Sequence, residues 1–427
     1  MTLAILVVSL LLFLVIGTPV GVALGVVALV GLLITGDNLA VIPQIIYDTL
    51  TIYELAAVPL FVLMGQVLLV GGVGERLFSV INRWVQHLPG GLGVATVLTC
   101  GFFSAVAGSS TATAATVGTT AIPEMLKRGY PKHLAYGLVA GGGTLGILIP
   151  PSIPFVLFAA ITSESVGRLY LAGVIPGLVM IGTFILYVFA LSLIGEGLPR
   201  AARVPLRERI EHSIRNIGAL LLPVVVLGGI YAGIFTPTEA AAAGAIYSVL
   251  LCGIGYRTIG WRETVSFLGA TVRISCMILL IIASALVLAR VVTTLQVAPL
   301  IINAFEGLSG DGAMWLFLLA MIVTWFVMGA FLDVASIMLI TLPVAFPVVL
   351  SLGIDPIWFA VIMVVNMELA TITPPIGLNL FVIQGVTGER NISPVLRGVV
   401  PVFLLLLANL ALVMAVPSLS LWLPFQY

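Results

Sequence analysis

Residues suited to binding a small anion lie in a run of hydroxyls and glycine inside an apolar stretch. The run SAVAGSSTAT at 104–113 lies in the middle of the apolar residues 92–126 and includes Ser109 and Ser110. Small residues permit a tight turn, and Ser or Thr can cap the helix that follows. That helix would offer unpaired N–H groups and a positive dipole end to an anion. Close helix packing is the alternative use of small residues in membranes, but the position at a turn favours an anion site.

Oxygen ligands for a cation are expected where paired prolines interrupt two helices. The interruptions are GGGTLGILIPPSIP at 141–154 and NMELATITPPIGLN at 366–379. Each proline pair removes two N–H donors and frees carbonyl oxygens from helical hydrogen bonds. At membrane depth those carbonyls need protein, water or a cation as partner, and unwound backbone binds Na⁺ in other transporters. The pattern therefore favours Na⁺ sites over purely structural kinks.

Two acids lie within these apolar regions. Asp333 interrupts the apolar residues 312–350, and an intramembrane carboxylate indicates function by default. N-capping of the next helix is an equally good explanation of Asp333. Glu368 could exchange a proton, or it could pair with an arginine or reach water.

The composition excludes an ordinary soluble enzyme. Of 427 residues, 61% are hydrophobic and 8% are charged, against roughly 25% charged in soluble domains. Lys+Arg and Asp+Glu are both 17, so no basic field exists for nucleic acid. The cysteines and histidines lack disulfide or metal-ligand spacing, and no nucleophile–base pair is evident. The chain is expected to be an all-α polytopic membrane protein without enzymatic activity.

Apolar segments of spanning length predict ten transmembrane crossings, with both termini outside. The stretches 92–126 and 312–350 are too long for one span, and each is predicted to be a re-entrant hairpin or two short spans. Either reading gives the same number of crossings. This topology places 15 of the 17 Lys and Arg residues inside, leaving only Arg168 and Arg290 outside, as the positive-inside rule requires.

Landmarks recur in order along the two halves of the chain. Their offsets drift only from 218 to 225, and the recurring pairs are Pro19 and Pro237, Pro123 and Pro347, Pro150 and Pro374, and Pro176 and Pro401. The recurrence predicts a first repeat at 1–195 and a second at 216–427, joined by a solvated cytoplasmic linker at 196–215. Each repeat contains five crossings, an odd number, so the second repeat is inverted.

Each predicted repeat has the same internal order. Scaffold helices at 1–91 and 216–311 precede a hairpin and a broken helix at 92–165 and 312–388. The first hairpin is expected to enter from inside and the second from outside. Inverted repeats with paired broken helices are typical of secondary transporters.

The motifs GSSTATA at 108–114, GILIPPS at 146–152 and TPPIGLN at 373–379 resemble the large membrane subunit of TRAP transporters, and the resemblance covers essentially the whole chain. It implies sodium-driven import of an organic acid, such as a C4-dicarboxylate or sialic acid, by an elevator mechanism. The implied setting is the bacterial inner membrane and its lipid. The implied partners are a separate four-helix membrane subunit and a periplasmic substrate-binding protein.

The resemblance also implies which residues bind. The first Na⁺ site would involve Ser104, Gly146, Ile149 and Pro151, and the second Gly329, Ala370, Thr373 and Ile376, mostly through backbone carbonyls. The substrate would lie near Ser109, Ser110, Asp333 and Asn379. The repeat offset of 224 pairs Gly146 with Ala370 and Ile149 with Thr373.

Other functions remain open. A single-component sodium/anion symporter would contain similar hairpins and broken helices. A channel could also use two re-entrant segments, although inverted repeats argue against a pore.

Overall fold

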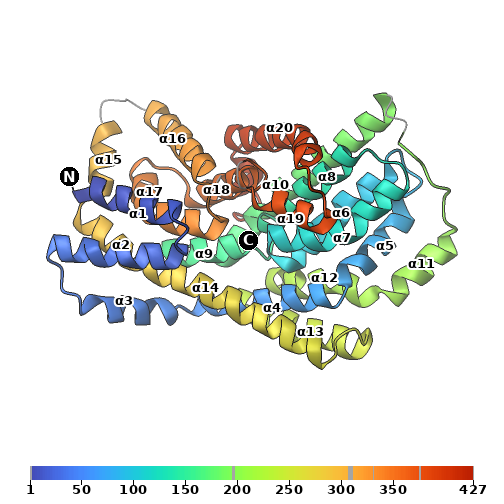
Figure 1. The fold of residues 1–427 in the computed structure, drawn as a ribbon, viewed down its shortest axis with the longest axis horizontal. Coiled ribbons are helices and arrows are strands. Elements are labelled where there is room, and N and C mark those ends of the chain that lie inside the picture. The colour runs from blue at the N-terminus through green and yellow to red at the C-terminus, as the bar shows by residue number, and fades with distance from the viewer. Residues whose placement is uncertain (1, 195–197, 306–310, 330, 375–376, 427) are drawn as a thin grey trace.

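The computed structural model describes residues 2–194, 198–305, 311–329, 331–374 and 377–426, and every regular element in them is a helix (Figure 1). Seven of these helices are long and apolar enough to cross a bilayer. An eighth span results if α11 (Leu206–Arg215) and α12 (Ile217–Tyr231), which are bent by 63°, count together. The prediction of an all-α polytopic protein is confirmed to this extent, and the ten crossings stay a prediction. Helices dominate because a spanning helix satisfies its own backbone polar groups.

The first half of the chain contains the helix pair and the broken helix that the sequence predicts. The hairpin at 92–126 consists of α6 and α7, and the break at Pro150-Pro151 lies between the short 3₁₀ helix η2 and α9. The elements of this half are α1 (Thr2–Val15), α2 (Val20–Thr35), α3 (Val41–Leu50), η1 (Tyr53–Ala56), α4 (Ala57–Val70), α5 (Val73–Val85), α6 (Gly91–Ala107), α7 (Ser110–Lys127), α8 (Lys132–Thr144), η2 (Leu145–Ile147), α9 (Ile153–Thr162) and α10 (Val166–Ile194).

The second half places its helices in a similar order after α11 and α12. Thr236 and Glu239 form a capping box at the start of α13, which explains why Thr-Pro begins a helix there. The further elements are α13 (Pro237–Leu250), the π-helical η3 (Leu251–Gly255), α14 (Trp261–Thr294), α15 (Val297–Phe305), α16 (Asp311–Gly329), α17 (Val334–Ser351), α18 (Pro356–Thr371), α19 (Leu378–Thr387), α20 (Ser393–Ala415) and α21 (Ser418–Leu421).

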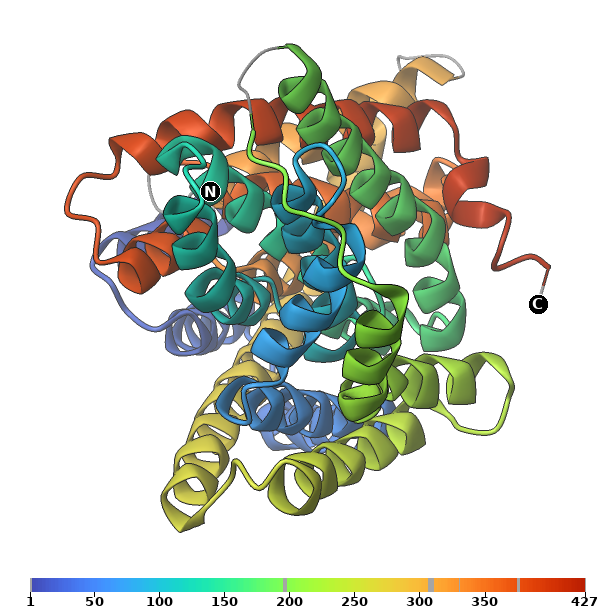
Figure 2. The same cartoon turned by 90° about the vertical axis from the view of Figure 1, so that its right-hand side faces the viewer.

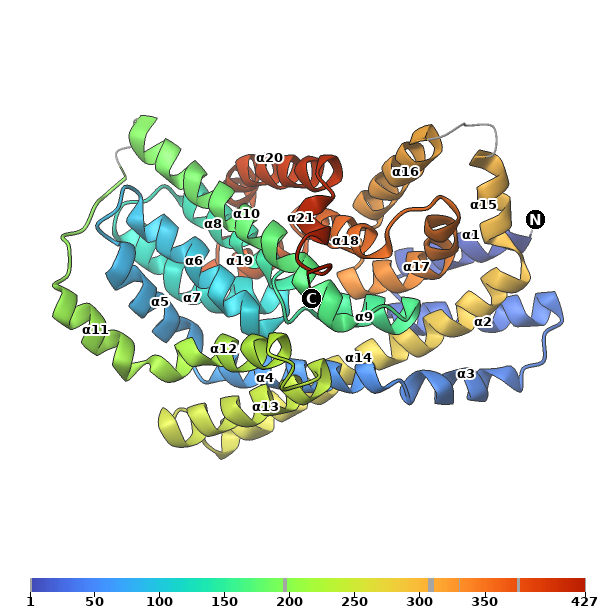
Figure 3. The ribbon, with the colours of Figure 1, turned by 180° about the vertical axis from the view of Figure 1, so that it is seen from behind.

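One side of the molecule consists of helices from the two predicted scaffold regions. Helices α2, α3, α4, α13 and α14 run along this side, and the long α14 packs against α2, α3 and α4 (Figures 1 and 3). Glycines permit the close approach, because a Cβ on Gly31 would lie only 2.6 Å from Val291 of α14. Small residues serve this purpose widely in membrane helices.

The other side contains the two hairpins and the broken helices. Helix α8 packs against α7 and α20, and α18 packs against α16 and α20. The crossing of α8 and α20 depends on two glycines, since a Cβ on Gly137 would lie 2.1 Å from the carbonyl oxygen of Gly398. Residues far apart in sequence therefore meet where the hairpins and breaks lie.

Candidate functional site

The first hairpin turns at Gly108 and Ser109. Gly108 has φ 60°, a left-handed conformation that ends α6 and that glycine adopts without steric cost. Ser109 caps α7, accepting a hydrogen bond from the N–H of Ala112 at 3.5 Å. Its carbonyl oxygen accepts a hydrogen bond from the Thr113 hydroxyl at 2.9 Å. The predicted tight turn and helix cap are both confirmed.

This turn lies directly against the break in the first broken helix. A Cβ on Gly146 would lie 2.5 Å from the Ser109 carbonyl oxygen, and a Cβ on Gly108 would lie 2.8 Å from that of Pro151. The fold thus brings together hairpin and break residues that are about forty positions apart in the chain. The Ile149 side chain points toward Gly177 of α10.

Ser104 supplies a hydroxyl without a protein partner in this region. The residue is fully buried, and its Oγ makes no hydrogen bond, which is costly unless a ligand or water completes it. The possible ligand atoms here are a hydroxyl oxygen and backbone carbonyl oxygens. These are hard neutral oxygens, which suit an alkali cation rather than a transition metal. Among the described residues, no group of three or more His, Cys, Asp or Glu could form a different metal centre. The residues present therefore fit Na⁺.

The second break shows a related contact between a hairpin and a broken helix. A Cβ on Gly329, at the end of α16, would lie 2.1 Å from the Cβ of Ala370 in α18. Thr373 donates its hydroxyl to the Leu369 carbonyl at 2.6 Å, which leaves the hydroxyl's lone pairs free. Three of the four residues expected at the second Na⁺ site can be placed in this way, and Ile376 lies outside the described residues.

Asp333 caps α17 at the second hairpin. One carboxylate oxygen accepts from the N–H groups of Ala335 at 3.1 Å and Ser336 at 3.3 Å. The other oxygen accepts from the Ser336 hydroxyl. Both oxygens are thus bound to the residue's own helix, as the N-capping interpretation predicts. Contact of Asp333 with a substrate stays a prediction.

Asn379 and Ser110 connect the two halves of the chain. The Asn379 amide donates to the Ser110 hydroxyl at 2.7 Å and to the Ala140 carbonyl at 3.1 Å. Asn379 is fully buried and Ser110 is nearly so. These bonds join α19 to α7 and α8, so the two predicted substrate residues also fix the position of the first hairpin. Their contact with substrate stays a prediction.

Two further polar features belong to this side of the molecule. Glu368 is fully buried, and neither of its carboxylate oxygens has a hydrogen-bond partner.

Near one end of α8, Lys132 forms an ion pair with Glu389 at 2.7 Å, and Tyr136 donates to the same carboxylate at 3.1 Å. The hydrogen bonds from Lys132 and Tyr136 hold the pKa of Glu389 below its ordinary value. Sequence reasoning missed this cluster because Glu389 lies more than 250 residues from Lys132 and Tyr136 and no motif marks the three residues.

The whole arrangement has a counterpart among known families. Residues 7–419 match the family described as tripartite ATP-independent periplasmic transporter, DctM component. The chain belongs to this family. The resemblance noted in the sequence is therefore confirmed over nearly the entire chain.

Relatives of this TRAP permease have names that state a substrate. The chain is 42% identical over 397 residues to a C4-dicarboxylate TRAP transporter large permease protein of Pseudomonas aeruginosa, covering 93% of this chain and 92% of that protein. It is 33% identical to a sialic acid TRAP transporter large permease protein of Vibrio cholerae, covering 96% and 95%. Among solved structures, the YdaH transporter of Alcanivorax borkumensis is similar with a TM-score of 0.56 at 16% identity, covering 87% and 86% of the two chains. That likeness concerns the fold.

Membership establishes the general role of the chain. TRAP large permeases are multi-pass membrane transport subunits and not enzymes. They work with a periplasmic binding protein and usually with a small membrane subunit.

Proposed function

We propose that this TRAP permease is the transport subunit of a sodium-coupled importer of an organic acid. The observation that most supports Na⁺ coupling is the buried Ser104 hydroxyl, which has no hydrogen-bond partner and belongs to α6, the helix that leads into the turn packed against Gly146. A bound Na⁺ would supply positive charge to the free oxygens and to the acid. The coupling sites proposed are the two predicted from sequence, at the hairpin–break contacts in each half.

In this proposal, Na⁺ binding and substrate binding are coupled because both depend on the position of the same hairpin turn. Ser104 lies one helical turn before Gly108 in α6, and Gly146, in the break, packs against the Ser109 carbonyl of the same hairpin turn. Ser109 and Ser110, at the start of α7, lie at the same turn. Closure of this contact would therefore order the helix N-terminus that faces the substrate's carboxylate. A site that closes fully only with both ligands gives a tight coupling of their movements.

The proposed movement is an elevator in two inverted repeats with ten crossings. The side with α6–α9 and α16–α19 would slide as a transport domain against the side with α2–α4 and α12–α14. The repeated order of hairpin and broken helix in both halves supports this division. The orientation proposed has both termini in the periplasm, because 15 of the 17 basic residues then lie on the cytoplasmic side of the inner membrane.

The substrate class proposed is a small carboxylate, either a C4-dicarboxylate or a sialic-acid-like molecule. This class suits a site built from hydroxyls and a helix N-terminus, and the names of the relatives support it. The partners proposed are a small four-helix membrane subunit and a periplasmic protein that delivers the acid.

Uptake into proteoliposomes tests this proposal. We would measure labelled succinate, malate and sialic acid with the chain alone, with the small subunit, and with the binding protein added outside. An inward Na⁺ gradient should drive uptake only in the complete system, and a matched K⁺ gradient should not. Equal uptake with the K⁺ gradient would refute sodium coupling. Uptake by the chain alone would favour the alternative, a single-component sodium/anion symporter.

A further inference from the structure

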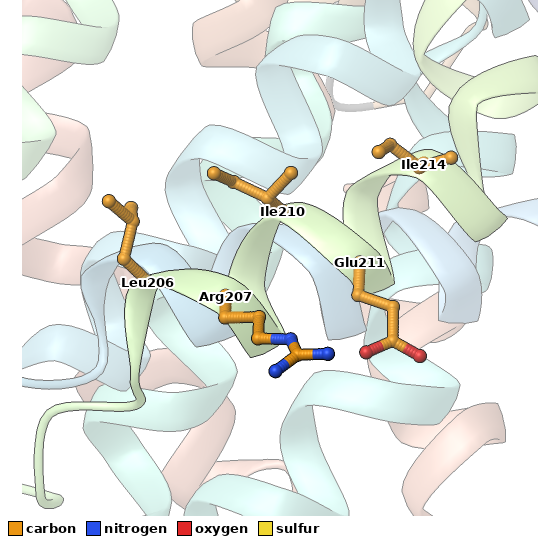
Figure 4. A pocket seen from close by; sticks show the side chains of 5 residues that line it. All are labelled: Leu206, Arg207, Ile210, Glu211 and Ile214. Atoms are coloured by element: carbon orange, nitrogen blue, oxygen red, sulfur yellow. The ribbon is translucent and has the colours of Figure 1, made fainter.

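Helix α11, in the segment between the two predicted repeats, has its apolar side turned away from the protein. Leu206, Ile210 and Ile214 are 60%, 45% and 61% exposed. They recur every four residues and therefore share one face of the helix. Figure 4 shows the three side chains along one edge of α11, with Arg207 and Glu211 on the adjacent edge. We call Leu206, Ile210 and Ile214 the α11 apolar face.

Polar contacts hold this helix in its orientation. Arg209 is only 4% exposed, and its Nε donates to the Val204 carbonyl just before the helix at 2.7 Å, so its side chain lies on the buried side of α11. His212 Nε2 lies 2.9 Å from the Ser79 hydroxyl of α5. Figure 2 views this end of the molecule, where the green α11 lies beside the blue α5. The protein therefore binds the polar side of α11 and leaves the apolar face outward, the reverse of a soluble surface helix.

Helix α11 lies at a large angle to the apolar helix that follows it in the chain. It is bent by 63° relative to α12, the apolar helix that follows it. Spanning helices tilt on average about 20° from the bilayer normal. If α12 spans, α11 runs nearer to the membrane plane, at the end of the molecule opposite the N-terminus (Figures 1 and 3).

The surroundings of the α11 apolar face have the chemistry of a headgroup region. Trp84 is 40% exposed and donates its indole N–H to the Ser213 hydroxyl at 3.0 Å, and tryptophan favours the membrane–water interface. The segment 200–216 contains five arginines and two glutamates. The arginines with exposed side chains are Arg200, Arg203, Arg207 and Arg215. This excess of positive charge complements the anionic phosphates of a cytoplasmic leaflet.

We propose that α11 is an interfacial helix that lies on the inner leaflet of the membrane. Its apolar face enters the boundary between headgroups and acyl chains, and its exposed arginines contact anionic phospholipid headgroups. This differs from the solvated linker that the charge of residues 196–215 suggests. Because α11 also contacts α5 and α12, the attachment fixes the depth of that part of the chain in the bilayer.

A spin-label scan of α11 in the full-length chain tests the proposal. The chain would contain Cys276→Ser, because Cys276 is exposed whereas Cys100 and Cys252 are buried. Single cysteines would replace each of residues 206–215, and the labelled protein would be placed in nanodiscs. Collisions with oxygen, which concentrates in lipid, would be compared with collisions with a water-soluble nickel chelate.

The expected result is a helical periodicity of lipid contact. Labels at Leu206, Ile210 and Ile214 should collide with oxygen and be shielded several-fold from nickel, whereas labels at Glu208 and Glu211 should show the reverse. Equal nickel collisions on both faces would overturn the proposal and restore the solvated linker. The three apolar positions report on the same face, so the remaining two still test the proposal if one variant does not fold.

Two further arms identify what covers the face. Replacing phosphatidylcholine by phosphatidylglycerol should move the spin label at position 210 deeper into the bilayer. The double variant Arg203→Gln and Arg207→Gln should abolish that change in depth. Inorganic phosphate added to phosphatidylcholine nanodiscs should not reproduce it, and a response to free phosphate alone would refute headgroup binding. Shielding from both reagents that occurs only with the small membrane subunit would overturn the proposal in favour of a protein partner.

Discussion

Replacing Gly146 by alanine should weaken Na⁺ activation of transport. A Cβ at this position would lie 2.5 Å from the Ser109 carbonyl oxygen, 2.7 Å from its carbon and 2.9 Å from the Ser110 nitrogen. All three neighbours are backbone atoms, so no side-chain rotation can relieve the overlap. Ordinary Cβ contacts begin at 3.4 Å, and the hairpin turn must therefore move away from the break by about 0.9 Å.

The size of the effect follows from the cost of overpacking. Extra methyl groups in a packed core cost about 1–3 kcal/mol. If Na⁺ binding requires the closed contact, this energy opposes binding and raises the half-saturating Na⁺ concentration roughly 5- to 150-fold. The assay is the Na⁺ dependence of uptake by the reconstituted complete system.

The matched control for this change is Gly182→Ala in α10. A Cβ on Gly182 would meet nothing within 4 Å, so this variant should keep the wild-type Na⁺ dependence. Protein yield and thermal unfolding would verify that both variants fold. An unchanged half-saturating Na⁺ concentration in folded Gly146→Ala would refute the placement of a Na⁺ site at the hairpin–break contact.

Four further changes test other parts of the site. Ser104→Ala should not lower the Na⁺-free melting temperature, because the Ser104 Oγ makes no hydrogen bond that the change would remove. It should reduce the rise in melting temperature on adding Na⁺, and an undiminished rise would exclude the hydroxyl as a ligand. Asp333→Ala removes a helix cap, at a cost of about 0.5–2 kcal/mol, and should abolish uptake while the protein stays folded; normal Na⁺-driven uptake would argue against any role in transport. Asn379→Ala removes the buried hydrogen bonds to the Ser110 hydroxyl and the Ala140 carbonyl and leaves the Ser110 hydroxyl without its amide partner, at a cost of about 1–3 kcal/mol. Thermal unfolding should therefore occur at lower temperature, and an equal melting temperature would contradict the bridging role. The hydrogen bond from Lys132 holds the pKa of Glu389 below its ordinary value, so this carboxylate stabilises the fold above the ordinary carboxyl pKa and loses the effect as pH falls through its lowered pKa. The melting-temperature advantage of wild type over Glu389→Gln should be present at neutral pH and vanish in acid, and a pH-independent difference would refute this assignment.

Local signals in the sequence explain why the hairpin turn and the breaks are predictable. Gly108 and Ser109 form the turn because glycine adopts positive φ and serine caps the next helix. The break at Pro150 follows from the missing N–H groups. Such effects act within a few residues, so they can be recognised without knowledge of the rest of the chain.

Contacts between residues far apart in the chain cannot be predicted from such local signals. The bond between Ser110 and Asn379 joins positions 269 apart, and the pair of Lys132 and Glu389 joins positions 257 apart. Nothing in the local sequence selects either partner. The orientation of α11 was likewise unpredictable, because its charges suggest a solvated linker while polar contacts to α5 turn its apolar face outward.

The sequence by itself determined that this protein is a helical membrane transporter subunit, and where its helices turn or break. These properties depend on hydrophobicity, on glycine and proline, and on motifs read along the chain. Only the tertiary structure decided which oxygens meet, that Ser104 has no partner and that Asp333 caps its own helix. Packing selects these outcomes because hydrogen bonding and burial depend on distances across the fold, which short-range preferences do not specify.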